Sequence, residues 1–493
     1  MLSNISSSAK LLLDKYEIKQ NREQDPIYIP KEISNSDKET IISEYIDSEE
    51  PNLNYLRLIA NIQSRIDKLE ISPKNLLRAK RKAEEQEKHF FKENSGIQYE
   101  SSVTFSKNQN EEVNLIVEGQ SVSASYSTKW LENNTDYATL LNNFIYLFEF
   151  VDIQMRCTLV NKTSEMGVLE RLMFTSSQNA YNKGFAFEQK NILSHLQMSS
   201  YYHQLFSMGI RIEKVIEWFF EDYLSKEFSA QSFKVKMPSA NSTFLEKCTN
   251  IMPALEAVLK QYILFVEEGH IDFELLEIRS DHLIYKNIPS LEKKKYAYGS
   301  GDEYNTATFL LFSDQCSLGY HKETEESYDN FFKFLLNDQI KLSEIADYNK
   351  SKVNWLIDHK YLSIDEHEYI IFNDKQLILI LNDLYMNNVV SYWKFSENGR
   401  KIIDDLEKRN VIEIDSTLFS RPEQDYINYT LNKSQFNNGL DLRNKYSHIQ
   451  PTSGEDESFH NQSYLIFLRL FILTIIKIND EFCTTKENKN GSE

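Results

Sequence analysis

The sequence predicts a mainly α protein with a minor β component, divided into several domains. Only 13 of its 493 residues are glycine and 9 are proline, which is too few for the many turns of a β-sandwich or propeller. Apolar residues make up 41% of the chain and aromatic residues 13%, a composition typical of globular proteins. The chain is too long for one hydrophobic core, so about two to four domains are expected.

The first predicted domain, residues 1–130, begins with charged helices and ends in strands. Residues 78–85 place basic side chains directly before acidic ones, as on a solvated helix face. Apolar residues then alternate with polar ones in three short segments that are separated by turn residues. This pattern predicts a small antiparallel β meander over residues 99–105, 113–117 and 121–126.

The second predicted domain, residues 131–337, is a helical region with a few strands. Helices are expected over residues 140–159, 166–174, 187–223 and 250–268. Strands are expected over residues 271–278, 282–285 and 306–312. Histidines and acidic residues gather between 270 and 282, but their spacing fits no metal-binding motif. No phosphate-binding loop or dinucleotide-binding motif occurs either, so neither a metal nor a cofactor is expected.

The third predicted domain, residues 338–373, resembles a winged helix-turn-helix. A helix over 341–346, a turn and a second helix over 350–359 precede two short strands between 361 and 372. Lys350 and Lys352 lie on the second helix, which is the element that enters a DNA groove in proteins of this kind. The turn between the strands is acidic, which disfavours contact with phosphates. We therefore expect a spacer or a protein-docking module rather than a DNA reader.

The fourth predicted domain, residues 374–493, is a helical bundle. Its helices are expected over residues 377–395, 396–408, 422–431, 439–449 and 457–483. The run 464–478 is apolar nearly all round, but Arg469 and Lys477 interrupt it and it is too short to cross a bilayer. A helix of this kind packs inside a bundle or against a second protomer.

The helix over 439–449 carries the candidate site. Leu442, Tyr446 and Ile449 recur at helical spacing and form a core-facing stripe. Asn444 and His448 are four residues apart and share the opposite face, while Arg443 lies between the two faces. A segment with lysine in place of arginine occurs at Lys190, Asn191 and His195. Because lysine cannot grip a phosphate bidentately, we interpret this second segment as a coincidence.

The spacing of Arg443, Asn444 and His448 resembles the RNxxxH motif of the HEPN superfamily. These are small all-α domains, and many are ribonucleases of bacterial toxin, anti-phage and abortive-infection systems. The resemblance covers about the last quarter of the chain, with the motif helix directly before a long final helix. It implies a catalytic site of Arg443, Asn444 and His448, with Lys433 and Lys445 beside it to bind RNA, tRNA being one candidate. It also implies a homodimer through the C-terminal domain.

The chemistry expected at such a site is hydrolase-type RNA cleavage without metal. His448 moves protons near neutral pH, Arg443 stabilises the phosphorane and Asn444 orients the reacting groups. One histidine does not easily act as both acid and base, so two copies in a dimer suit the reaction. The resemblance also implies that residues 131–337 are a sensor or regulatory region with a phage trigger or an antitoxin protein as partner, because a free ribonuclease would poison its host.

Composition leaves two alternatives open. The net charge of −19 opposes nonspecific binding of nucleic acid, although Lys433, Arg443 and Lys445 outnumber Asp441 around the motif. A catalytically silent HEPN-type adaptor that binds a protein and a winged-helix transcription regulator both remain possible. Four widely spaced cysteines and the absence of a visible signal peptide predict a reduced, cytoplasmic protein with no membrane contact.

Overall fold

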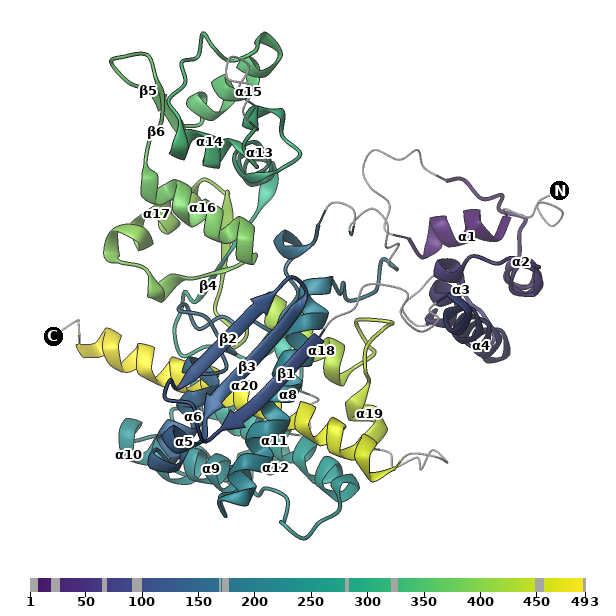
Figure 1. Cartoon of the computed structure of the whole chain (residues 1–493), viewed down its shortest axis with the longest axis vertical. Helices are drawn as coiled ribbons and strands as arrows, with labels where there is room; N and C mark the ends of the chain where they lie inside the picture. Colours follow the sequence, from purple (N-terminus) through teal and green to yellow (C-terminus); the bar gives the residue numbers. More distant parts are fainter. Residues whose placement is uncertain are drawn as a thin grey trace.

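The computed structural model describes residues 8–18, 27–63, 69–90, 100–167, 170, 177–279, 283–320, 327–447 and 456–490. Within these ranges the protein is mainly helical with small sheets, which confirms the predicted fold class. The buried apolar residues form three large groups that correspond to three lobes in Figure 1. These groups cross the predicted domain boundaries, because segments far apart in sequence share one core.

The N-terminal lobe is helical, as predicted, and its described residues form four helices. They are α1 (Ser8–Tyr16), α2 (Asn35–Asp47), α3 (Leu53–Ala60) and α4 (Pro73–Phe90). Leu13, Ile42 and Leu56 are fully buried between them. A capping box fixes the start of α2, because Ser34 and Asp37 satisfy each other's backbone amides. This lobe lies apart from the three-stranded sheet with which the prediction had joined it (Figure 1).

The three predicted strands form, but not as a meander. They are β1 (Glu100–Ser106), β2 (Val113–Glu118) and β3 (Ser121–Ser127), in the spatial order β1-β3-β2. Gly119, at φ +62°, allows the tight turn that pairs β2 antiparallel with β3. The antiparallel prediction is wrong for β1, which runs parallel to β3. The central position suits β3, since its Val122, Ala124 and Tyr126 are buried while β2 is exposed along its whole length.

The central lobe is built from two parts of the chain, its middle and its C-terminal segment. Buried apolar residues between 124 and 288 form one core with residues between 418 and 482. Its longest helix, α20 (Glu457–Asn490), packs on α11 (Phe244–Glu268) and α8 (Phe185–Ser207). The other helices are α5 (Thr128–Asn133), α6 (Tyr137–Tyr146), α9 (Ile212–Trp218), α10 (Leu224–Phe228), α12 (Phe273–Ile278), α18 (Arg421–Leu431) and α19 (Leu442–Ser447). Since α20 is apolar all round, it needs cover on every side, and residues 374–493 alone do not supply it.

Three of the predicted helices end early. The helix expected over 377–395 stops as α16 (Lys375–Asn387), because Asn388 caps it with a φ of +62°. The helix expected over 140–159 stops as α6 at Tyr146, because Glu149 and Met155 adopt positive φ and Asp152 closes a turn with its side chain. The helix expected over 187–223 breaks after α8, where Gly209 has φ +76°. The helix expected over 166–174 falls largely outside the described residues.

Two segments predicted as strands are helices. Residues 273–278 form α12, because Asp272 caps the backbone amides of Glu274 and Leu275. Residues 301–312 form α13 (Gly301–Phe312), in which Ala307, Leu310 and Leu311 are buried on neighbouring sides. A short, mostly apolar run does not distinguish a buried helix from a strand by its pattern alone. Of the strand expected over 282–285, residue 282 lies outside the described residues and Tyr285 begins a 3-10 turn.

The third lobe, residues 296–412, contains the predicted winged-helix-like segment. Here α15 (Asp347–Asp358) is followed by the antiparallel pair β5 (Leu362–Ile364) and β6 (Ile370–Phe372), close to the prediction. The helix expected over 341–346 is only a turn. The other elements are α14 (Phe331–Asn337), α16 (Lys375–Asn387), β7 (Val390–Ser391) and α17 (Glu397–Lys408), with β4 (Tyr296–Gly299) and β8 (Ile412–Asp415).

This lobe contains the same supersecondary unit twice, with an offset of 50 residues. Helices α14 and α16 end at Asn337 and Asn387, and α15 and α17 begin 50 residues apart. The strand order also repeats, since Lys341, β6 and β5 in the first unit correspond to β7, β4 and β8 in the second. The second unit is thus completed by a strand that precedes the first. We call residues 296–415 the repeat module.

Candidate functional site

The helix α19 has the orientation that the sequence predicts. Leu442 and Tyr446 are buried against the core, and α19 packs on α11 and α18. Asn444 is exposed on the other side of the helix. One residue of the candidate motif, Asn444, is therefore presented away from the core, and Arg443 is partly buried. His448 and Ile449, the remaining predicted residues of this helix, lie outside the described residues.

The side chain of Arg443 is held by an acidic residue from α11. Its Nε donates a hydrogen bond to Oε1 of Glu256 at 2.8 Å, and the two side chains are 29% and 23% exposed. Among the residues that the structure describes, the two terminal nitrogens of Arg443 have no hydrogen-bond partner. They carry the donors that a guanidinium uses to bind a phosphate bidentately.

The other predicted residues of the site lie on α19 and in the loop after α18. Asn444 donates to Oδ1 of Asp441 at 2.8 Å, and Asp441 itself has φ +57° at the start of the helix. Lys445 places its ammonium 3.6 Å from the ring centre of Phe459. Lys433 is exposed in the loop after α18. The positive excess expected around the motif is smaller than the sequence suggested, because Glu256 offsets the charge of Arg443.

A second histidine beside the motif helix was missed by the sequence analysis. His460, in the first turn of α20, is buried, and its Nδ1 shares a 2.9 Å hydrogen bond with the hydroxyl of Tyr446. Its backbone carbonyl accepts a hydrogen bond from the thiol of Cys248. His460 therefore connects α19 to α20 and α11. Its spacing of four residues before the buried Tyr464 was the available signal, since residues i and i+4 share a helix face.

The lysine-containing segment on α8 has structural partners. The guanidinium of Arg469 donates to the side chain of Asn191 at 2.8 Å and to the hydroxyl of Ser194 at 2.7 Å. Lys190 forms an ion pair with Glu165. Burial, reinforced by the nearby charge of Arg469, lowers the pKa of His195 to about 4. Each of these groups is already engaged in packing α8 against its neighbours.

The apolar surface of α20 is covered within the chain. Leu468 and Phe471 are completely buried, together with most apolar residues between 464 and 482. The core built by α8, α11 and α20 accounts for this burial without a second protomer. Packing inside a bundle, one of the two arrangements expected for this helix, is therefore the one that the structure shows, and the homodimer stays a prediction.

Across the described ranges, no three histidine, cysteine, aspartate or glutamate side chains come together as metal ligands. Asp272, one of the acidic residues considered in the sequence, serves as a helix cap. No described helix combines the length and the apolar character needed to span a bilayer.

Comparison with known proteins identifies no relative of this chain. No protein-family model, no curated protein and no solved structure matches the chain.

Proposed function

We propose that this protein is a metal-independent endoribonuclease whose active site is centred on α19. The observation that carries the proposal is the orientation of this helix. It directs Leu442 and Tyr446 into the core and leaves Asn444 exposed, with the terminal nitrogens of Arg443 unpaired among the described residues. A polar helix surface that packing does not require is available for chemistry.

In the proposed reaction, the 2′-hydroxyl of the RNA attacks the adjacent phosphorus. His448 of one copy removes the hydroxyl proton, and His448 of a second copy donates a proton to the departing 5′-oxygen. Arg443 stabilises the negative charge of the phosphorane, and Asn444 orients the phosphate by hydrogen bonding. The products are a 2′,3′-cyclic phosphate and a 5′-hydroxyl, so no water activation and no metal are needed.

The dimer in this proposal is formed around the α19 surface. It rests on the need for two proton-transfer groups and on the HEPN resemblance, since α20 is already covered. Lys433 and Lys445 border the same surface and would contact the RNA backbone. A light-scattering mass of one chain for a fully active sample contradicts the composite site.

The biological setting follows from the same resemblance. We propose a cytoplasmic effector of an anti-phage, abortive-infection or toxin system, with tRNA among its candidate substrates. The N-terminal lobe and the helices before α18 would sense a phage trigger or an antitoxin protein and hold the nuclease inactive. The repeat module would act as a rigid spacer or protein-docking element.

A catalytically silent adaptor is the second candidate, and one observation favours it. The pair between Arg443 and Glu256 satisfies much of the arginine's charge inside the chain, as expected of a structural ion pair. A winged-helix regulator has less support. Lys350 pairs with Asp347, and Lys352 bonds to Ser317 and Asn349, so neither lysine is freely presented.

The decisive experiment compares purified wild type with single alanine variants of Arg443, Asn444 and His448. Each variant is expected to lose RNA cleavage, and toxicity on induction in a bacterium, while keeping its unfolding midpoint. EDTA is expected to leave wild-type cleavage unchanged, and sequenced products are expected to carry 5′-hydroxyl ends.

Two matched controls keep this test specific. Arg57→Ala removes a half-exposed arginine that also pairs with a glutamate, and His367→Ala removes an exposed histidine on the β5–β6 turn. Both controls are expected to cleave normally. Cleavage by His448→Ala at the wild-type rate, or complete inhibition by EDTA, rules out the proposed metal-independent site on α19. Absence of any cleavage by the wild type leaves the adaptor.

A further inference from the structure

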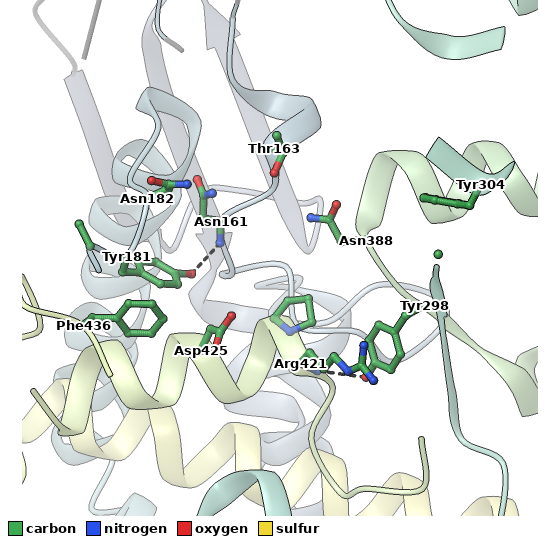
Figure 2. A pocket seen from close by; sticks show the side chains of 13 residues that line it. Asn161, Thr163, Tyr181, Asn182, Tyr298, Tyr304, Asn388, Arg421, Asp425 and Phe436 are labelled. Atoms are coloured by element: carbon green, nitrogen blue, oxygen red, sulfur yellow. Dashed lines mark hydrogen bonds between the residues drawn. The ribbon is translucent and has the colours of Figure 1, made fainter. Parts of the chain in front are cut away.

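A polar cavity lies where the central lobe meets the repeat module. It has a volume of about 420 Å³, within the range of small-molecule sites. The core contributes Asn161, Thr163 and Asp425, and the module contributes Tyr298 and Asn388 (Figure 2). Sites between domains are common places for ligands, because groups from two units converge there.

The cavity offers hydrogen-bonding groups that the fold does not use. Thr163 and Asn388 are exposed at the mouth of the cavity, and among the described residues their side chains have no hydrogen-bond partner in the protein. The side-chain oxygen of Asn161 accepts a hydrogen bond from the backbone amide of Gly184. Its side-chain nitrogen has no partner among the residues that the structure describes. Polar groups that packing leaves unpaired are the ones that fix a ligand's orientation.

Asp425 provides the charged group of the cavity. Figure 2 shows its carboxylate on α18, on the opposite side of the cavity from Asn388. One oxygen accepts a 2.6 Å hydrogen bond from Gln435, and the other has no partner within the described residues. Burial raises the pKa of Asp425. A half-buried carboxylate with a vacant oxygen favours a ligand that presents N–H donors.

The cation in the cavity is not available for a phosphate. Arg421 donates to Asp415 at 2.8 Å and also to Glu413, so two carboxylates already share its charge. Its guanidinium carbon lies 4.2 Å from the ring centre of Tyr298, in a cation–π contact. Three further aromatic residues line the cavity: Tyr181, Tyr304 and Phe436. This lining suits a planar, uncharged ring rather than an anion.

We propose that this cavity binds a nucleoside that carries an exocyclic amine, such as guanosine or cytidine, without a phosphate group. The vacant oxygen of Asp425 accepts a hydrogen bond from the amine, as aspartate does when it reads cytosine. The aromatic residues and the Arg421–Tyr298 pair contact the faces and edges of the base. The ribose hydroxyls meet Thr163 and Asn388. Because the ligand contacts both lobes, its binding stabilises their junction. This proposal does not depend on the nuclease assignment.

The test is titration calorimetry on the full-length protein with guanosine, cytidine, uridine and inosine. Guanosine or cytidine is expected to bind at micromolar to millimolar concentration and to raise the melting temperature. Uridine and inosine, which lack the exocyclic amine, are expected to bind at least about tenfold more weakly. Asp425→Asn keeps an oxygen that accepts from Gln435 but removes the charge, and it is expected to weaken guanosine or cytidine binding by about tenfold or more.

The control variant is Asp405→Asn, which makes the same charge change on an exposed residue of α17. It is expected to bind as the wild type does. The proposal is overturned if neither guanosine nor cytidine binds at millimolar concentration, or if Asp425→Asn binds them unchanged. Equal binding of inosine, or of ribose alone, overturns the role of the base. Tighter binding of the nucleoside monophosphates overturns the phosphate-free site.

Discussion

At the residue scale, the candidate site consists of a predictable part and an unpredictable one. The buried positions of Leu442 and Tyr446 and the exposure of Asn444 follow from helical periodicity, which is a local property. The partner of Arg443 is Glu256, which lies 187 residues earlier in the chain. No sequence pattern connects residues so far apart, because their contact depends on how α11 and α19 pack.

The hydrogen bond between Tyr446 and His460 allows a graded test of what holds α19 in place. Tyr446→Phe removes only the hydroxyl and is expected to lower the free energy of unfolding by about 1 kcal/mol. Tyr446→Ala also removes the ring that packs against Phe467 and is expected to cost about 3 kcal/mol. Urea unfolding curves of the three proteins measure both values. Equal losses for the two variants would show that the ring contributes nothing.

The low pKa of His195 predicts how stability depends on pH. Its pKa is about 4 in the folded protein, because burial and the charge of Arg469 disfavour the imidazolium, against about 6.5 in an unfolded chain. The unfolded state therefore binds the proton first, and stability is lost as the pH falls from 6.5 towards 4. In the His195→Gln variant, the stability lost on going to acid pH is expected to be smaller than in the wild type by roughly 1–3 kcal/mol. Denaturant midpoints of both proteins at pH 7 and pH 4.5 measure this loss, and an equal loss in the two proteins contradicts the prediction.

At the scale of elements, prediction succeeded where local signals agree with tertiary packing. The second helix and the strand pair of the winged-helix-like segment were predicted correctly, because Val353 and Leu356 have helical spacing and the following residues alternate as strands. The first helix of the expected helix-turn-helix is only a turn, so the winged-helix resemblance stays a prediction. The duplication of this unit was not found, since the two copies share few identical residues. The parallel pairing of β1 with β3 was also missed, because pairing order is a non-local property that alternation does not encode.

The recognition-helix position of α15 gives a test of the repeat module. Lys350 pairs with Asp347 and Lys352 bonds to Ser317 and Asn349 within the module. The double variant Lys350→Ala with Lys352→Ala is therefore expected to leave RNA cleavage and its salt dependence unchanged. Cleavage rates measured over a salt series check this. A salt slope smaller by about one unit per lysine would identify phosphate contacts and assign nucleic-acid binding to the module.

At the scale of the whole molecule, buried ion pairs connect the repeat module to the central lobe. Arg156 of the core donates to Asp383 at 2.7 Å and to the carbonyl of Val389, both in the module. Lys295, next to β4, pairs with Glu481 of α20, and both side chains are almost fully buried. The same α20 that fills the core therefore also holds the module. Long-range pairs of this kind are invisible in the sequence, where each partner is only one charged residue among many.

Glu481 is the junction residue whose replacement is expected to cost the most stability. Its carboxylate accepts hydrogen bonds from the hydroxyl of Ser290, the amide of Leu291 and the ammonium of Lys295. Glu481→Gln leaves the buried Lys295 without a counter-charge and is expected to lower the free energy of unfolding by roughly 3–5 kcal/mol. Asp480→Asn is the matched control, because its partner Lys394 is more exposed, and its cost is expected to be roughly 1 kcal/mol.

A further variant distinguishes an unpaired charge from lost packing. Glu481→Gln combined with Lys295→Met removes both charges, and much of the stability lost in the single variant is expected to return. Denaturant unfolding measures the three variants, and hydrogen exchange of β4 and β8 reports whether the junction opens before the core. If the double variant is no more stable than Glu481→Gln, the loss comes from the hydrogen bonds to Ser290 and Leu291. In that case the carboxylate stabilises the fold by ordering the segment that leads into β4, and the unpaired charge of Lys295 costs little stability.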